Sequence, residues 1–279
     1  MLARAWRAFA PAAVALLSAA LLSAAVLLGA MPRTAAAQPP ARPIAPDQLR
    51  SGASFNSPDL QAQQADDFAN PGMLWVDQGA TLWSGAPAAG SPSCASCHGD
   101  AKQSMRGVAA RLPKADPATG GLINLQGAIN ACRTRRQGQP ALAYESQPLL
   151  ALAAYVGHQS RGLPIAVDVG GAAAPWFERG RSLYHQRLGQ MNLACTHCHD
   201  RLWGRRLLAE PISQGQPNAY PIYRHEWQGM GTLHRRLRAC LFGVRAEMLP
   251  QGADDYLALE LYLAWRGQGL PVETPGVRR

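Results

Sequence analysis

The sequence lacks most features of a membrane protein, and its acidic residues are few. Of its 279 residues, only an apolar run at about 9–28 approaches the length of a membrane span, which excludes a protein with several spans. The chain has 18 Asp and Glu against 27 Lys and Arg. Basic runs at 133–136 and 234–238 would suit nucleic acid in another setting. Beside the cysteine motifs described below, they favour anionic substrates or acidic partner surfaces, and we expect no nucleic-acid partner.

The N-terminal segment is typical of an export signal. Arg4 and Arg7 precede the apolar run, and residues 35–37 are small, as a cleavage site requires. We expect cleavage after residue 37, which leaves a periplasmic chain with no membrane attachment. The loss of three arginines and no acidic residue lowers the formal net charge from +9 to +6. An uncleaved membrane anchor is the alternative, because the run is long for a signal core.

Cysteine is also scarce, and its six residues form one pattern that occurs twice. Residues 94–98 and 195–199 both read Cys-x-x-Cys-His. Two thiols at this spacing reach the vinyl groups of a haem c while the next imidazole binds the iron. A disulfide or a zinc site is the alternative, but the His that follows each pair favours two covalently bound haem c groups. The predicted attachment residues are Cys94, Cys97, Cys195 and Cys198, and the predicted proximal ligands are His98 and His199.

One more cysteine follows each motif. Cys132 lies 34 residues after the first proximal His, and Cys240 lies 41 residues after the second. We favour both as thiolate iron ligands, because they occupy corresponding places and supply one thiolate per haem. A disulfide between them is the alternative in an oxidising compartment, although it would join two separate haem pockets. Ordinary electron carriers use Met or His instead, and the candidates are Met105, Met230, Met248, His158, His225 and His234.

An internal repeat contains the two motifs. Gly79 and Gly180 each stand 15 residues before the first cysteine of their motif, with no gap needed. Further along, residues 149–164 match residues 256–271. Each motif therefore belongs to one of two copies of the same unit, which we call the first and the second copy.

Strand-like alternation is scarce, whereas apolar residues at helical spacing predict helices over 146–159 and 256–265. The sequence therefore predicts an all-α protein of two tandem cytochrome c-like domains related by the repeat, with an extended N-terminal arm rich in Pro, Ala and Ser. The predicted bounds are 1–37 for the signal peptide, 38–70 for the arm or linker, 71–170 for the first haem domain and 171–279 for the second, which carries the active site.

Arginine distinguishes the second copy from the first. Arg236 lies four residues before Cys240 and shares its helix face, whereas Ala128 holds the matching place before Cys132. Iron and neighbouring arginines would keep the Cys240 sulfur ionised, and the same face can hold an anion beside it. We therefore predict the chemistry at the second site. The first site is expected to handle electrons or to be a structural twin.

Together these residues resemble the SoxA family, the dihaem subunit of the SoxAX cytochrome complex of periplasmic thiosulfate oxidation. The resemblance covers about residues 61–271. It rests on both haem motifs, on 128–133, on 150–164, and on Arg236 with Cys240. Some members of the family have lost the first haem. Because both motifs and both single cysteines are present here, the resemblance implies the dihaem form, with two His/Cys-ligated haems.

The resemblance also implies the reaction. An L-cysteine S-thiosulfotransferase of this family joins thiosulfate oxidatively to a cysteine of the SoxYZ carrier protein and releases two electrons. Cys240 would be the active-site residue, with a possible persulfide, and Arg236 would hold the sulfonate end of the substrate. The implied partners are a monohaem SoxX cytochrome in a heterodimer, SoxYZ, and a small cytochrome c that accepts the electrons.

Two other functions fit parts of the sequence. A plain dihaem electron carrier would have Met at both irons. A dihaem peroxidase would need an open distal position, which two resident thiolates leave only if one of them is released.

Overall fold

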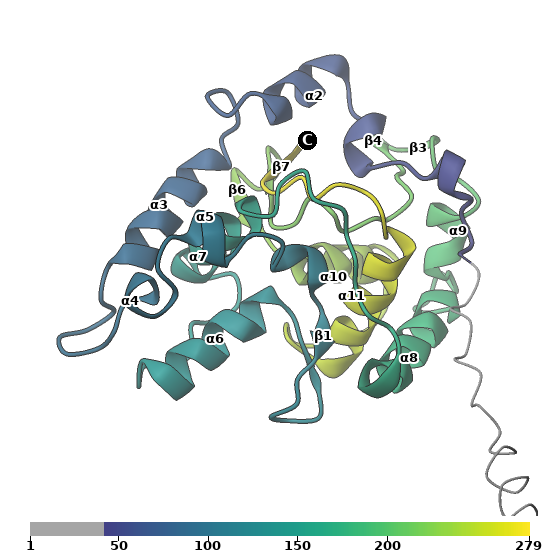
Figure 1. Cartoon of the computed structure of the whole chain (residues 1–279). Coiled ribbons are helices and arrows are strands. Elements are labelled where there is room, and N and C mark those ends of the chain that lie inside the picture. The colour runs from purple at the N-terminus through teal and green to yellow at the C-terminus, as the bar shows by residue number, and fades with distance from the viewer. Residues whose placement is uncertain (1–41) are drawn as a thin grey trace, which may run out of the picture. The chain divides into compact units, whose positions relative to one another are not determined.

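The computed structural model describes residues 42–279. The predicted signal peptide and the start of the arm lie outside the described residues. Residues 42–279 belong to one compact unit, Ala41–Arg279. Within residues 42–279, no helix combines the length and apolarity needed to cross a membrane. Figure 1 shows α3 to α7 on one side of this unit and α8, α9 and α11 on the other.

A crossed helix pair forms the frame of the first copy. Helix α3 (Met73–Ser84) packs against α7 (Gln147–His158), which has Pro in its first turn and a largely buried apolar surface. At the crossing, a Cβ on Gly79 would lie 2.1 Å from the carbonyl oxygen of Ala151. Only glycine permits this approach, which explains the residue at that place in the repeat. The predicted helix over 146–159 is therefore confirmed within one residue at each end.

The second copy has the same kind of crossing. Helix α8 (Ala174–His185) packs against α11 (Asp254–Arg266), and a Cβ on Gly180 would lie 2.0 Å from the carbonyl oxygen of Ala258. Helix α11 covers the helix predicted over 256–265 and begins two residues earlier. The same close contact thus occurs at matching residues of both copies.

Short helices carry the cysteine motifs. The first copy has α4 (Cys94–His98), followed by α5 (Ala101–Ser104) and α6 (Leu125–Arg136), on which Cys132 lies. The second has α9 (Cys195–His199) and α10 (Leu233–Gly243), on which Cys240 lies. Asn124 caps α6 and Thr232 caps α10 through side-chain oxygens that accept backbone N–H groups. Each single cysteine therefore has a capped helix to position it. The 3-10 turns η3 (Ala109–Arg111) and η4 (Gly171–Ala173) lie in the connections.

Strands also occur, although the sequence predicted an all-α fold. None is longer than three residues, which is too short to show a period of two in the sequence. Two antiparallel pairs and one three-stranded sheet of order β6-β5-β7 are formed, and β5 pairs with β7 in parallel. The strands are β1 (Lys114–Ala115), β2 (Leu122–Ile123), β3 (Arg206–Leu207), β4 (Glu210–Pro211), β5 (Ile222–Arg224), β6 (Gly229–Gly231) and β7 (Gly276–Arg278).

The two copies share part of their packing. The segments after α7 and α11 lie side by side, and the matching residues Pro164 and Pro271 face each other in a β-bridge. The core of the second copy also takes in Leu122 and Ile165 of the first. The sequence had suggested a separate core for each copy, but apolar pattern along one chain does not show which faces pack together.

The N-terminal arm packs on the C-terminal end of the chain. It contains η1 (Pro46–Gln48), η2 (Gly52–Phe55) and α2 (Pro58–Ala65), and Figure 1 shows α2 beside the C-terminal strand. Asn56 Nδ2 donates to the Val277 carbonyl at 3.2 Å, and Asn70 Nδ2 donates to that of Pro275 at 2.9 Å. The sequence had not shown what this segment packs against.

Candidate functional site

In the second cysteine motif, His199 uses one imidazole nitrogen for a hydrogen bond to the backbone. His199 Nδ1 lies 2.7 Å from the carbonyl oxygen of Ser213. Because a carbonyl only accepts, Nδ1 must carry the proton, which leaves Nε2 with a free lone pair. This is the tautomer that binds a metal through Nε2. His197, inside the motif, instead accepts the N–H of Ala194 at 3.0 Å and so caps α9.

Cys240 faces this histidine from α10. Burial raises the pKa of its thiol, but the neighbouring His199 ring and the charges of Arg236 and Arg224 outweigh that effect, so its pKa lies below the usual value. Protein atoms surround the sulfur, yet the residue itself is exposed. Cys240 is therefore not part of the packed core.

The two attachment cysteines lie beside the same sulfur. Burial, and then the Cys240 sulfur, raise the pKa of Cys195 to about 11. Burial and Cys240 also raise the pKa of Cys198. The sulfurs of Cys195, Cys198 and Cys240 thus lie near one another and near the His199 imidazole, a donor set that fits a covalently attached haem c. Among residues 42–279 no three His, Cys, Asp or Glu side chains are grouped to hold a metal ion directly, and a haem iron needs only two such ligands.

The first motif has a similar set of sulfurs in different surroundings. Burial, and then the neighbouring Cys132, raise the pKa of Cys94; burial, and then Cys97, raise that of Cys132. The Trp83 ring lies 5.6 Å from the ring of His98, tilted by 35°. Cys132 therefore lies with the first motif and Cys240 with the second. All six cysteines are free in the structure, so no disulfide joins the two sites.

Arg236 is the arginine of α10 that faces Cys240. Burial lowers the pKa of its guanidinium, but Cys240 and the Tyr220 hydroxyl raise it more, so the net direction is upward. The neighbouring arginines are engaged elsewhere: Arg235 lies 4.3 Å over the ring of Trp227, and Arg238 donates to the Leu249 carbonyl. Arg236 is therefore the arginine of α10 that lies beside Cys240, whereas Arg235 and Arg238 contact other groups.

Two further residues at this site were missed by the sequence analysis. Arg224, at the end of β5, is 4% exposed and forms ion pairs of 3.2 Å with Glu210 and Glu226. It also helps to lower the pKa of Cys240. Tyr220 precedes β5; burial raises the pKa of its hydroxyl, while Arg236 and Arg224 lower it. No motif marks either residue, because only the fold brings the segment around β5 near enough to Cys240 for their charges to interact.

Several of the alternative iron ligands are engaged in other contacts. Met230 is 2% exposed and packs with Tyr223 and Val277. His234 has both nitrogens occupied, since Nδ1 accepts the Gly252 N–H at 3.0 Å and Nε2 lies 3.0 Å from Glu260. His225 contacts Gln63 at 2.9 Å, and Met105 packs among apolar residues near the first motif. Met248 is 41% exposed, and Cys240 is the candidate that lies beside His199.

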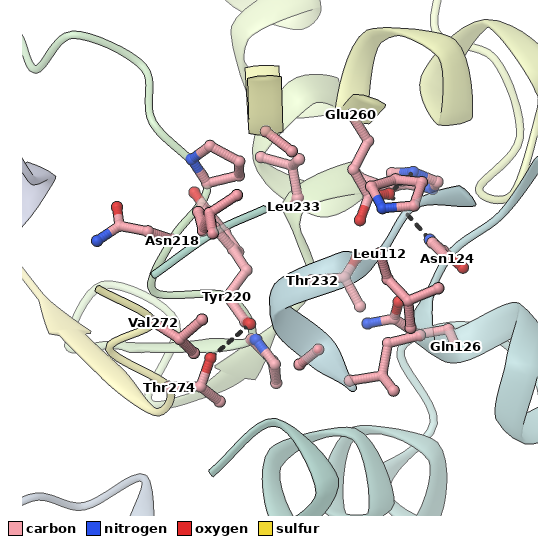
Figure 2. A pocket seen from close by; sticks show the side chains of 18 residues that line it. Leu112, Asn124, Gln126, Asn218, Tyr220, Thr232, Leu233, Glu260, Val272 and Thr274 are labelled. Atoms are coloured by element: carbon pink, nitrogen blue, oxygen red, sulfur yellow. Dashed lines mark hydrogen bonds and ion pairs between the residues drawn. The ribbon is translucent and has the colours of Figure 1, made fainter. Parts of the chain in front are cut away.

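A cavity of about 60 Å³ lies between the two copies. Figure 2 shows its walls, where Asn124 of the first copy donates to Glu260 of the second at 2.9 Å. Residues Tyr220, Thr232 and Thr274 also line it. It contains none of the haem-motif residues and is far smaller than a haem, so we assign it no part in the chemistry.

Comparison with known proteins shows which proteins the chain resembles. Two relatives named L-cysteine S-thiosulfotransferase subunit SoxA match most of the chain. The one from Pseudaminobacter salicylatoxidans is 42% identical over 247 residues, which are 88% of this chain and 86% of that protein. The one from Paracoccus pantotrophus is 39% identical over 232 residues, which are 83% of this chain and 80% of that protein.

A solved structure and a family model complete the assignment. The crystal structure of SoxXA from P. pantotrophus matches with a TM-score of 0.80 and 38% identity, over 83% of this chain and 87% of that one. Residues 78–165 match the SoxA/TsdA cytochrome c domain, so the protein is a c-type cytochrome and its cofactor is haem c. With the similarity extending over most of its length, the chain belongs to the SoxA family.

Proposed function

We propose that this chain is the SoxA subunit of an L-cysteine S-thiosulfotransferase and acts on thiosulfate in the periplasm. The relatives that match most of its length carry that name. The observation that carries the proposal is the position of Cys240, whose sulfur meets His199 on one side and Arg236 on another. An ionised sulfur beside a cation is the arrangement that sulfur transfer to and from an anion needs.

Each copy is proposed to hold one haem c, so that 71–170 and 171–279 act as two haem domains. The thioether residues would be Cys94 and Cys97 in the first and Cys195 and Cys198 in the second. The iron ligands would be His98 with Cys132, and His199 with Cys240. The haem, when bound, would supply the capacity to take up electrons at the reacting sulfur. The structure supports this assignment by grouping each set of four residues on two neighbouring helices.

The substrate anion would be held by arginine. Arg236 can donate two parallel hydrogen bonds to the sulfonate oxygens of thiosulfate, which leaves the outer sulfur directed toward Cys240. Arg224 adds positive charge from β5, but its ion pairs with Glu210 and Glu226 fix it in place. We therefore assign substrate binding to Arg236 and a supporting electrostatic role to Arg224.

The reaction joins two sulfurs and releases two electrons. The thiol of a SoxYZ cysteine loses its proton, a bond forms between its sulfur and the outer sulfur of thiosulfate, and two electrons leave the pair. Cys240 would carry the sulfur in a covalent intermediate, with a persulfide as its resting or transient form. Its lowered pKa favours the ionised sulfur that this step requires.

The partners follow from the same proposal. The solved relative is a complex named SoxXA, so we propose a heterodimer with a monohaem SoxX cytochrome. Electrons would pass to a small cytochrome c, and SoxYZ would bring the cysteine to be modified. The predicted export signal would deliver the chain to the periplasm, where haem c is attached.

Intact mass of the purified complex, measured with and without reductant, tests the proposal. We expect a mass that includes two haems and a sulfur on Cys240 that reductant removes. Absorption of the ferric protein in the near infrared should show no band from methionine ligation. A Cys132–Cys240 disulfide, or methionine bound at both irons, would show instead that the protein is a simple electron carrier or has another role.

A further inference from the structure

One loop touches the ring of His199 on two sides. We call residues 212–218 the histidine loop. The Ser213 carbonyl accepts the Nδ1 proton at 2.7 Å. Gly215, with φ of 77°, lies so close that a Cβ there would be 3.1 Å from Cγ of the ring. The position of this loop therefore determines both the direction of the Nδ1 hydrogen bond and the plane of the imidazole.

A buried glutamine ties the histidine loop to the N-terminal arm. Gln214 is 0% exposed, and its side chain points away from His199 to the segment around η1. Its Oε1 accepts the backbone N–H of Arg50 at 2.8 Å, and its Nε2 donates to the Gln48 carbonyl at 2.8 Å. Removal of this amide would take away both hydrogen bonds between the loop and the arm and leave a space at a buried position.

Further hydrogen bonds lie on either side of the contact between Gln214 and the N-terminal arm. On the arm side, Ser51 accepts from Asn218 at 3.2 Å. On the opposite side, Arg266 donates to Asp200, the residue after His199, at 2.6 Å, and reaches the Gln214 carbonyl at 3.4 Å. Because Arg266 is buried, this ion pair fixes the end of α9 to α11. The histidine loop is thus also held at both of its ends and by Arg266, and Gln214 adds its direct connection to the arm.

The first site has a different arrangement. Among the described residues, the ring of His98 is contacted by Trp83 at 5.6 Å between ring centres, and Trp83 Nε1 donates to the Gly99 carbonyl at 3.1 Å. The arm precedes both copies of the repeat and makes its buried amide contacts with the loop of the second. The two proximal histidines therefore differ in what orients them.

We propose that Gln214 is a positioning residue through which the N-terminal arm holds the His199 ring and thereby tunes the ligand field and reduction potential of the second haem. Gln214 acts through the Ser213 carbonyl and the Gly215 backbone. The proposal rests on the proposed assignment of His199 as an iron ligand. It gives the arm a role in the chemistry of a site about 150 residues further along the chain.

The test compares variants of the haem-loaded complex by three measurements: the low-spin electron paramagnetic resonance signal of each haem, the two reduction potentials, and amide hydrogen exchange of residues 212–218. Gln214→Ala removes both bonds to the arm. Arg50→Pro removes one donor N–H from the exposed side without altering the loop, and the extended conformation of Leu49 suits a following proline. Asn56→Ala is the matched control, because it removes an arm contact with β7.

In Gln214→Ala we expect exchange of residues 212–218 to be about tenfold faster, as the loss of buried hydrogen bonds predicts. The signal and the potential of the second haem should shift while those of the first stay unchanged. Arg50→Pro should shift the same signal by a smaller amount. Asn56→Ala should shift neither the signal nor the potential of the second haem.

Two results would overturn the proposal. Faster loop exchange with an unchanged second-haem signal and potential would show that Gln214 is structural only. If Gln214→Ala does not fold, unchanged spectra in Arg50→Pro would have the same meaning. A His199→Ala control separates this from the proposed function: if that variant keeps the second-haem signal, the ligand assignment itself fails, whereas a lost signal in His199→Ala with no response to Gln214→Ala contradicts the positioning role alone.

Discussion

The two cysteine motifs share a framework but not their surroundings. In both copies a crossed helix pair meets at a glycine, Gly79 or Gly180, whose close contact leaves no room for a Cβ. In both, one cysteine on a capped helix lies beside the motif. The same helix arrangement therefore places the sulfurs in corresponding positions in both copies.

The difference lies in charge and in what contacts the proximal histidine. Arg236 and Arg224 lower the pKa of Cys240, whereas burial and a neighbouring thiol raise that of Cys132. Ser213 hydrogen-bonds His199, while Trp83 packs beside the ring of His98. One framework thus supports two sites: Arg136 acts on Cys132 without lowering its pKa on balance, whereas Arg236 and Arg224 contribute to a lowered pKa at Cys240.

Replacing Cys240 or Cys132 by alanine, one at a time, should produce the largest difference between the two sites. We expect Cys240→Ala to abolish thiosulfate-dependent modification of the SoxYZ carrier, because the variant lacks the sulfur that would form the intermediate. Cys132→Ala should retain it in large part. Intact mass of the carrier after incubation with thiosulfate and an electron acceptor measures both.

The control for this pair is the haem content of each variant. Both should retain two attached haems, since the thioether cysteines are unchanged. Equal loss of carrier modification in the two variants would contradict the functional difference between the sites.

Removal of Arg236 should have the next largest effect. Arg236→Ala deprives the thiosulfate anion of a charge-assisted pair of hydrogen bonds, and such bonds contribute about 1.5–3 kcal/mol each. We expect kcat/KM for thiosulfate to fall by roughly 10- to 100-fold, with both haems still attached.

Arg235→Ala is the matched control for Arg236. It removes the same charge from the same helix, but its guanidinium lies over Trp227 instead of beside Cys240. Its steady-state kinetics should change by less than about threefold, as expected for a partly exposed charge. If both variants lost activity to the same degree, general positive charge and not a specific anion site would be responsible.

The two glycines test the part that the sites have in common. Gly79→Ala and Gly180→Ala each force a methyl group against a backbone carbonyl, so we expect each to lower the free energy of unfolding by about 1–3 kcal/mol. Thermal unfolding of the two variants should therefore shift by similar amounts. Gly170→Ala is the control, since its φ of −91° suits alanine and the nearest atom would be 3.4 Å away.

Much of this framework was predictable from the sequence, because its signals are local. The Cys-x-x-Cys-His runs fix which residues lie together, and the helical spacing over 146–159 and 256–265 gave the positions of α7 and α11. The equal distance from Gly79 and Gly180 to their motifs indicated a repeated structural requirement. The structure gives its reason as a helix crossing.

The remaining features depend on contacts between distant segments. Arg224 and Tyr220 come near Cys240 only through the fold of the chain, and strands of three residues leave no period in the sequence. The hydrogen bond from the Arg50 N–H to Gln214 joins residues 164 positions apart, and neither residue belongs to a motif. Sequence reasoning named the candidate reacting groups but not the residues that the fold places around them.

The smallest expected effect concerns the first site alone. Trp83→Phe keeps an aromatic ring beside His98 but removes the hydrogen bond of 3.1 Å from the indole nitrogen to the Gly99 carbonyl. Because a single neutral hydrogen bond contributes about 1 kcal/mol, the unfolding midpoint should fall only slightly. The low-spin signal of the first haem should shift, whereas the signal of the second haem and carrier modification should stay as in the parent protein. A change in carrier modification would mean that the first site takes part in the chemistry, and the distinction drawn between the two sites would then be wrong.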